Sequence, residues 1–186
     1  MDVLTAIKTR HSVGRVKPDP IPEAIINTLL SAAVQAPNHF KVRPWQFVVL
    51  TGGSREKFGE FLAKNLARNY SDSTQELLEK ARLKPLRAPL VIVLATARPE
   101  DPRVDDIENV CATAAAGQNI LLAAHSLGLG AIWRTGNDAR DPEVKNFFGF
   151  HPDQHLLGFL YIGYPEMTEF HYPERPSFED RTTWMG

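Results

Sequence analysis

The first side chains that could do chemistry are in the tripeptide Arg10-His11-Ser12, which follows a short expected helix over residues 3–9. Arginine offers a planar fork of donors that matches a phosphate group, and the hydroxyl of Ser12 adds another donor. An exposed arginine at the end of a helix is also favourable without any ligand. The tripeptide therefore suggests a phosphate site but does not establish one by itself.

A second candidate is the loop from Gln35 to Trp45, which joins an expected helix to an expected strand. It holds Gln, Asn, His, Lys and Arg side chains between two prolines and ends in Arg43-Pro44-Trp45. Prolines stiffen a loop, so its polar groups can be held at fixed angles for a flat polar ligand. The alternative is a solvated loop with an Asx turn at Asn38.

The third candidate is Trp133-Arg134-Thr135, which stands between glycines at the end of an expected strand. Glycines allow a ligand to approach the backbone. The spacing is not the dinucleotide-binding fingerprint, because no third glycine follows in register and the helix precedes the strand. The alternative is a tight connection with Arg134 in solvent.

Other chemistries lack their patterns. There is no G-x-S-x-G and no P-loop lysine. His151 and His155 are four residues apart, but Pro152-Asp153 favours a turn between them, so no metal site is expected. The single cysteine, Cys111, is predicted to be a small core residue. A solvated loop and helix start is expected for four clustered carboxylates, Asp101, Asp105, Asp106 and Glu108.

Composition places the chain among ordinary globular domains. It has 186 residues, 43% of them hydrophobic and 23% charged, with a net charge of -1. These values predict one domain over residues 1–186 and give no sign of a nucleic-acid or membrane surface. The N-terminus, Met1-Asp2-Val3, has no basic region followed by a long apolar one, so the expected compartment is the cytoplasm.

Helices and strands alternate irregularly, which predicts an α+β fold with a mixed or antiparallel sheet. Helices are expected over 3–9 with Asp2 as cap, from Pro22 to Pro37, from Ser54, over 71–83, over 106–127 and after Asp141. Strands are expected over 45–50, 90–96, 131–133 and 156–162.

The residues from 164 onward are rich in proline and aromatics and have no regular period. Such a tail is expected to lie along another surface, because its aromatic side chains favour burial. These side chains are Tyr164, Phe170, Tyr172, Phe178 and Trp184.

Taken in order, the three candidate segments resemble the nitroreductase family of FMN-dependent oxidoreductases over nearly the whole chain. The matching features are the early R-x-S, a proline-bounded loop that ends in R-P-W, and a long small-residue helix followed by a glycine-flanked strand. The W-R-[ST]-G segment at 133–136 is similar to that of a compact subgroup of the family. The resemblance implies a homodimer with FMN at the interface and with residues 165–186 packed on the partner subunit.

The resemblance also implies roles for residues. Arg10, His11 and Ser12 would hold the phosphate and ribityl end of FMN. Gln35 and His39 would line the flavin from the partner's loop. The flavin ring or phosphate would be met by Trp133, Arg134 and Thr135. A nicotinamide-contacting stretch would comprise Ala123, Ala124, His125, Ser126, Leu127 and Gly128.

One departure concerns charge near the flavin. Many family members have a lysine two residues past the serine, where this chain has Gly14. Either Arg15 or Arg43 is the expected substitute for that positive charge. The implied activity is electron transfer from NAD(P)H through the flavin N5 to small electron-poor acceptors such as nitroaromatics or quinones, by a ping-pong mechanism. Two alternatives remain, a non-catalytic FMN-binding or regulatory module and a flavin enzyme of this fold with unrelated chemistry.

Overall fold

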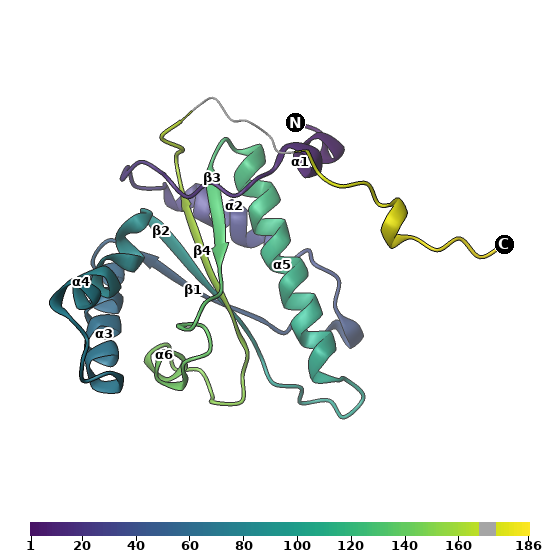
Figure 1. Cartoon of the computed structure of the whole chain (residues 1–186). Helices are drawn as coiled ribbons and strands as arrows, with labels where there is room; N and C mark the ends of the chain where they lie inside the picture. Colours follow the sequence, from purple (N-terminus) through teal and green to yellow (C-terminus); the bar gives the residue numbers. More distant parts are fainter. Residues whose placement is uncertain (168–173) are drawn as a thin grey trace.

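Four antiparallel strands form a central sheet in the order β1-β2-β4-β3 in the computed structural model, which describes residues 1–167 and 174–186 (Figure 1). The strands are β1 (Trp45–Thr51), β2 (Leu90–Thr96), β3 (Gly130–Arg134) and β4 (Leu156–Gly163). Every pairing is antiparallel, and β1 and β3 are the two edges. The α+β expectation is confirmed, and the described sheet is antiparallel rather than mixed.

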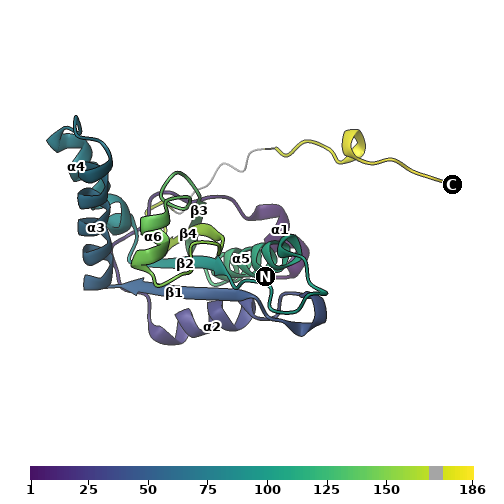
Figure 2. The ribbon, with the colours of Figure 1, turned by 90° about the horizontal axis from the view of Figure 1, so that it is seen from below.

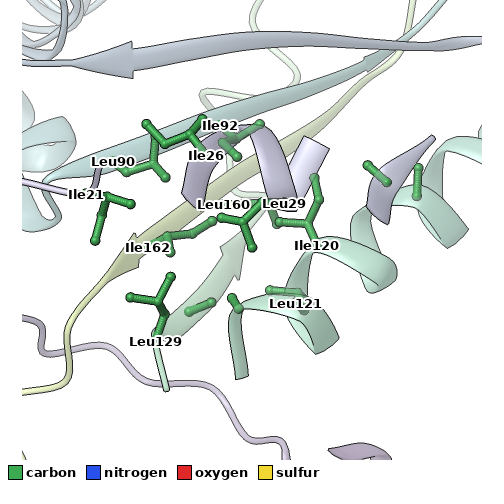
Figure 3. Packing of buried hydrophobic residues seen from close by; sticks show 14 of the residues in the cluster. Ile21, Ile26, Leu29, Leu90, Ile92, Ile120, Leu121, Leu129, Leu160 and Ile162 are labelled. Carbon is green, nitrogen blue, oxygen red and sulfur yellow. The ribbon is translucent and has the colours of Figure 1, made fainter. Parts of the chain in front are cut away.

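Helices cover both faces of the sheet. They are α1 (Val3–Thr9), α2 (Glu23–Ala33), α3 (Gly53–Asn69), α4 (Gln75–Leu83), α5 (Asp106–Ser126) and α6 (Pro142–Phe147). Helices α2 and α5 pack on one face, where Ile92 and Leu160 meet Leu29 and Ile120 (Figure 3). Helices α3, α4 and α6 pack their apolar residues on the other face. Strand β2 is buried along its whole length, because it is covered on both faces.

Most element bounds follow local signals. Asp2 caps α1 by accepting the amide of Thr5 at 3.0 Å, as expected. Helix α4 starts at Gln75 and not at Ser71, because Thr74 is the residue that caps it. Ser54 does not cap α3. Its hydroxyl donates to the carbonyl of Thr51 at 2.6 Å, and α3 begins one residue earlier, after Gly52.

Several apolar side chains lie outside the core of the single chain. Cys111 was expected in the core but is exposed, because it lies on the outer face of α5. The apolar stripe of α1 (Val3, Leu4 and Ile7) is also exposed, and only Ala6 of that helix is buried. These exposed apolar positions on α1 and α5 are candidate contacts for another surface.

Some aromatic side chains of the tail also lie outside the core of the single chain. Tyr164 is half-buried against the core, as expected. Phe178 and Trp184 are exposed, so their expected burial does not occur within the single chain. Phe170 and Tyr172 lie outside the described residues. Within the described part of the chain, no helix is both long and apolar enough to span a bilayer.

Candidate functional site

The segment after α1 runs along the free edge of β3. The amide of Val13 donates to the carbonyl of Ala131 at 3.0 Å, which holds the segment against the edge of β3. A Cβ at Gly130 would lie 2.7 Å from Val13, and one at Gly163 would lie 2.7 Å from Val16. Only glycine permits such a close approach. Because Gly130 and Gly163 have no side chain, the segment that contains Arg10-His11-Ser12 can lie directly against the sheet.

The C-terminal end of α5 is tied to the same segment. Thr9 Oγ1 lies 2.8 Å from Nε2 of His125, and the rings of His11 and His125 meet edge to face at 6.3 Å. Burial lowers the pKa of His125, and the nearby His11 and Arg10 lower it further. A histidine with a lowered pKa is neutral at neutral pH, so Arg10 is the permanent positive charge at this point.

A second arginine lies beside Arg10. The guanidinium of Arg175 donates from Nη2 to the backbone carbonyl of Arg10 at 2.9 Å. Burial lowers the pKa of Arg10, and the positive charge of Arg175 adds to this effect. Among the described residues, no carboxylate forms an ion pair with either arginine. Two adjacent guanidinium groups without a carboxylate suit a bound anion such as a phosphate.

The sequence reasoning missed Arg175. Its tail has no regular period, and 165 positions separate it from Arg10 along the chain. In the sequence Arg175 is followed by Pro176, but an arginine beside a proline is too common to indicate a binding site.

Arg134 is at the end of β3, and its guanidinium reaches the segment after α1. A Cβ at Gly14 would lie 3.9 Å from Nη2 of Arg134. The guanidinium lies 5.6 Å from the ring centre of Tyr161, and its Nε is buried without a hydrogen-bond partner among the described residues. Burial raises the pKa of Tyr161 to about 12, with a smaller contribution from Asp138, so this phenol is neutral at neutral pH.

The side chain of Trp133 has a structural role. Its indole N–H donates to the carbonyl of Leu157 at 2.9 Å. A Cβ at Gly117 of α5 would lie 2.9 Å from the indole ring, so the small residues of α5 make room for Trp133. The indole N–H is therefore engaged inside the protein. Thr135 is exposed beyond the end of β3.

The loop after α2 lies elsewhere. Nδ1 of His39 is 3.8 Å from a carboxylate oxygen of Glu108, near the start of α5. His11, in contrast, meets His125 near the end of the same helix. Glu108 and His125 are ~25 Å apart along α5, from a rise of about 1.5 Å per residue. Gln35 is exposed, and its amide reaches only the carbonyl of Ser31, in the preceding helix α2, at 3.4 Å. One chain therefore does not bring His39 to the arginine cluster, and among the described residues Gln35 makes no hydrogen bond to it.

The same loop has an unusual backbone. Phe40, Lys41 and Arg43 have φ angles of 44°, 57° and 50°, in the left-handed region. Such residues cost on the order of 1–3 kcal/mol each and persist only where their surroundings hold them. Asn38 provides one restraint, because its Oδ1 accepts the amide of Arg43 at 2.9 Å. The guanidinium of Arg103 provides another, 4.2 Å from the ring centre of Phe40.

Comparison with known proteins identifies the family to which this sequence and fold belong. The sequence pattern of the Nitroreductase family matches residues 7–164. The chain belongs to this family. It is 33% identical over 182 residues to YdjA of Escherichia coli (strain K12), whose name assigns it provisionally to the NAD(P)H nitroreductases; the match covers 96% of this chain and 98% of that protein.

Solved structures agree with the family. A nitroreductase-like protein from Bacillus cereus superposes with a TM-score of 0.82 at 26% identity, covering all of this chain and 96% of that one. A nitroreductase with bound FMN from Bacteroides fragilis superposes with a TM-score of 0.74 at 23% identity, with both chains covered completely. This second likeness establishes the fold alone.

The stretch that the nitroreductase resemblance links to NAD(P) contacts, residues 123–128, forms the end of α5 and its cap. Ala124 is fully buried in the core, whereas Leu127 is 43% exposed. Gly128 has a φ of 76°, which suits the residue after a helix. Contact with a nicotinamide through this stretch stays a prediction, and its exposed residues are Ser126, Leu127 and Gly128, next to the half-buried His125.

Proposed function

We propose that this protein is an FMN-dependent oxidoreductase that takes electrons from NAD(P)H and passes them to electron-poor acceptors such as nitroaromatics or quinones. Membership of the Nitroreductase family supports this function, as does the likeness to YdjA along the whole chain. The Bacteroides fragilis protein of the same fold holds FMN. A structure of NfnB from Mycobacterium smegmatis, at 19% identity and a TM-score of 0.75, contains NADPH.

The observation that carries the proposal is the pair Arg10 and Arg175, which lacks a carboxylate among the described residues. FMN has a single terminal phosphate, which carries close to two negative charges at neutral pH. Two guanidinium groups and the exposed hydroxyl of Ser12 would supply donors to that phosphate. His11 would complete the contact at the ribityl end. We therefore assign Arg10, His11 and Ser12 to the phosphate, as the resemblance implies, and add Arg175.

For the positive charge near the flavin we propose a source other than the expected Arg15 or Arg43. Arg134 is the cation whose guanidinium lies in the space next to Gly14, where many relatives have a lysine. Arg43 is instead in the loop near the start of α5. We propose that Arg134 supplies the charge.

We propose a homodimer, because the two groups of expected flavin contacts lie ~25 Å apart along α5 of one chain. His39 would then serve the cofactor that the arginine cluster of a second chain holds. The exposed apolar residues of α1 and α5, such as Ile7, Ile107 and Cys111, provide contact surface for the second chain. Next to His39 this surface is hollowed by a shallow pocket of about 400 Å³.

The chemistry follows from the proposed cofactor. FMN, when bound, accepts a hydride from the donor and returns electrons to the acceptor. The protein's part is to hold the phosphate with Arg10 and Arg175 and to place the positive charge of Arg134 beside the bound group. Tyr161 stays protonated at neutral pH, so it adds no negative charge near Arg134. Donor and acceptor would use one open face in turn, which gives ping-pong kinetics. No side chain is required as an acid or base.

The test begins with the visible spectrum of the purified protein. Heating should release a cofactor that co-migrates with FMN, and the protein should oxidise NAD(P)H when a nitroaromatic or quinone is present. Recovery of FAD, or of no flavin even after reconstitution, would contradict the proposal. Bound FMN without NAD(P)H oxidation would instead identify a non-catalytic FMN-binding module.

A second candidate is a flavin enzyme with different chemistry. A protein of Rhodobacter capsulatus named 5,6-dimethylbenzimidazole synthase is 29% identical over 90% of this chain. Its name describes a reaction other than nitro reduction, so membership of the fold does not fix the acceptor. A screen of acceptors at saturating NAD(P)H separates the two, because a dedicated enzyme turns over nitroaromatics and quinones far more slowly than its own substrate.

A further inference from the structure

The loop after α2 holds one bulky side chain in a costly backbone conformation. Phe40 has a φ of 44°, in the left-handed region, which makes it an outlier for an aromatic residue. The residue is 51% exposed, so burial in the core does not offset the strain. A glycine would adopt the same backbone at little cost. Strained residues of this kind are concentrated at active sites and ligand-binding sites.

A guanidinium covers the ring of Phe40 from one side. The Cζ atom of Arg103 lies 4.2 Å from the ring centre. Arg103 is itself fixed, because its Nε and Nη2 donate to the two carboxylate oxygens of Asp101 at 2.9 and 2.6 Å. The hydrogen bonds from Arg103 lower the pKa of Asp101 to about 2, so the pair stays charged at neutral pH. The ring is therefore held in one orientation on its strained backbone.

The edge of the same ring meets a residue that is expected to contact the flavin. The ring centres of Phe40 and His39 are 4.3 Å apart, and the two rings are nearly perpendicular, at 79°. Among the described residues no other ring and no other cation contacts Phe40. Figure 2, seen from the end of the molecule at which α5 begins, shows this loop beside the start of that helix. With both contacts in place, about half of Phe40 is still open to a further partner.

We propose that Phe40 forms one wall of the acceptor site and favours flat aromatic acceptors by stacking against them. The inference rests on the proposed function and on the homodimer, in which His39 serves the cofactor of the second chain. Phe40, which touches His39, then lies at the rim of that cofactor, where an acceptor approaches the open face. A ring that is fixed before the acceptor arrives loses little freedom on binding, so its stacking with a nitroaromatic or quinone ring favours binding with little entropic cost.

Steady-state kinetics with acceptors of different shape test the proposal on the FMN-loaded protein. Phe40→Leu removes the ring and keeps apolar bulk. It should lower kcat/KM for a naphthoquinone by about two- to tenfold, which is the ~0.5–1.5 kcal/mol of an aromatic pair at ~1.4 kcal/mol for each tenfold change. The loss should lie chiefly in KM. Ferricyanide has no aromatic ring, so its reduction should be unchanged. Phe40→Tyr keeps the ring and should behave as the wild type with both acceptors.

Two further variants separate the position of the ring from its presence. Arg103→Gln removes the cation that orients Phe40 and should lower kcat/KM for the naphthoquinone in the same direction, by less than Phe40→Leu, with the FMN content unchanged. Tyr70→Leu is the matched control. It removes another exposed ring, 59% exposed at the C-terminal end of α3, and should leave both acceptors unaffected.

The contrary outcomes are distinguishable from one another. If the Phe40→Leu dimer binds FMN and its kcat/KM for the naphthoquinone is unchanged, Phe40 is not a wall of the acceptor site, and the proposed function still stands. If Phe40→Leu loses FMN or dissociates on sedimentation while kcat/KM per bound flavin is unchanged, the ring is a subunit contact and the inference is wrong. An equal loss with naphthoquinone and ferricyanide also overturns it, because stacking requires a ring. A wild type that does not bind FMN or oxidise NAD(P)H overturns the proposed function itself.

Discussion

The two halves of the expected cofactor site are built in different ways. The arginine cluster around Arg10 is held by backbone pairing to the β3 edge and by close approach over Gly130 and Gly163. The loop that carries His39 is held by side chains, and three of its residues have left-handed backbone. The residues of the first group come together within one chain, and the second group presents its histidine away from that chain's cluster.

The difference indicates which interactions each half depends on. Charge-assisted contacts to a phosphate depend on the number of donors, so single substitutions in the cluster should change affinity strongly. The strained loop instead depends on where its side chains are placed. It keeps one conformation although each left-handed residue costs ~1–3 kcal/mol of conformational free energy. The following substitutions separate these two kinds of dependence, from the largest expected effect to the smallest.

Arg10→Ala should weaken FMN binding by about ten- to a hundredfold, because a charge-assisted hydrogen bond contributes ~1.5–3 kcal/mol and ~1.4 kcal/mol is a tenfold change in affinity. The free energy of unfolding should barely change, since the side chain of Arg10 is not in the core. Titration of the apoprotein with FMN by fluorescence quenching measures the Kd.

Arg10→Lys should restore part of the affinity, because it keeps the charge and loses the planar fork. Arg98→Ala is the matched control: this exposed arginine pairs with Asp153 at 3.3 Å and should leave the Kd unchanged. Equal Kd values for folded Arg10→Ala and the wild type would show that the phosphate is held elsewhere.

The elements that hold this cluster could be predicted from sequence because their signals are local. The apolar run of β2, the cap Asp2 and Gly128 each act within a few residues. The misplaced starts of α3 and α4 differ from expectation by one and four residues, because competing serines lie near both starts. Ser54 hydrogen-bonds its own turn instead of capping.

The composition of the site was harder to predict, because it depends on contacts distant in sequence. Arg10 meets Arg175 across 165 positions, and Gly14 meets Arg134 across 120 positions. The hydrophobic periodicity of a segment gives no information about such contacts. Cys111 was misplaced for a related reason, because a helix rich in small residues looks apolar on every side and does not reveal which face is covered.

Arg134→Leu should lower the midpoint reduction potential of bound FMN, because it removes a positive charge that would favour the anionic reduced flavin. The expected change is about 30 mV, which corresponds to ~1.4 kcal/mol for two electrons. Gly14→Lys in the Arg134→Leu background should raise the potential again, since a Cβ at residue 14 points at the space that Arg134 leaves. Spectroelectrochemical titration compares the three proteins. An unchanged potential in Arg134→Leu would place the charge elsewhere.

Mixing two chains that each bind FMN weakly tests whether the two halves come from different subunits. Arg10→Ala damages the cluster and His39→Ala damages the loop. If each site combines one half from each chain, random exchange gives mixed dimers with one intact site, so about one quarter of all sites regain wild-type FMN affinity. If both halves serve the same chain's cofactor, mixing restores no site. The fraction of high-affinity sites in an FMN titration distinguishes the two arrangements.

The smallest expected effect is a pH dependence through His125. Its pKa is lowered in the folded protein by burial first and then by His11 and Arg10, so the unfolded chain binds this proton more readily. The free energy of unfolding should therefore rise with pH through this group. The contribution is fully present above the unfolded value of about 6.5 and is lost as pH falls below it.

Urea unfolding of the apoprotein at about pH 8 and about pH 5.5, on either side of that value, measures the difference. His125→Asn should reduce this difference, because asparagine keeps a polar group near Thr9 but does not titrate. Saturating FMN should reduce it as well. A phosphate held by Arg10 lies close to His125, and its negative charge favours the protonated ring and offsets the two neighbouring cations. If FMN leaves the pH dependence of the free energy of unfolding unchanged, the phosphate does not lie near His125. Arg134 would then be the expected cofactor contact of the cluster.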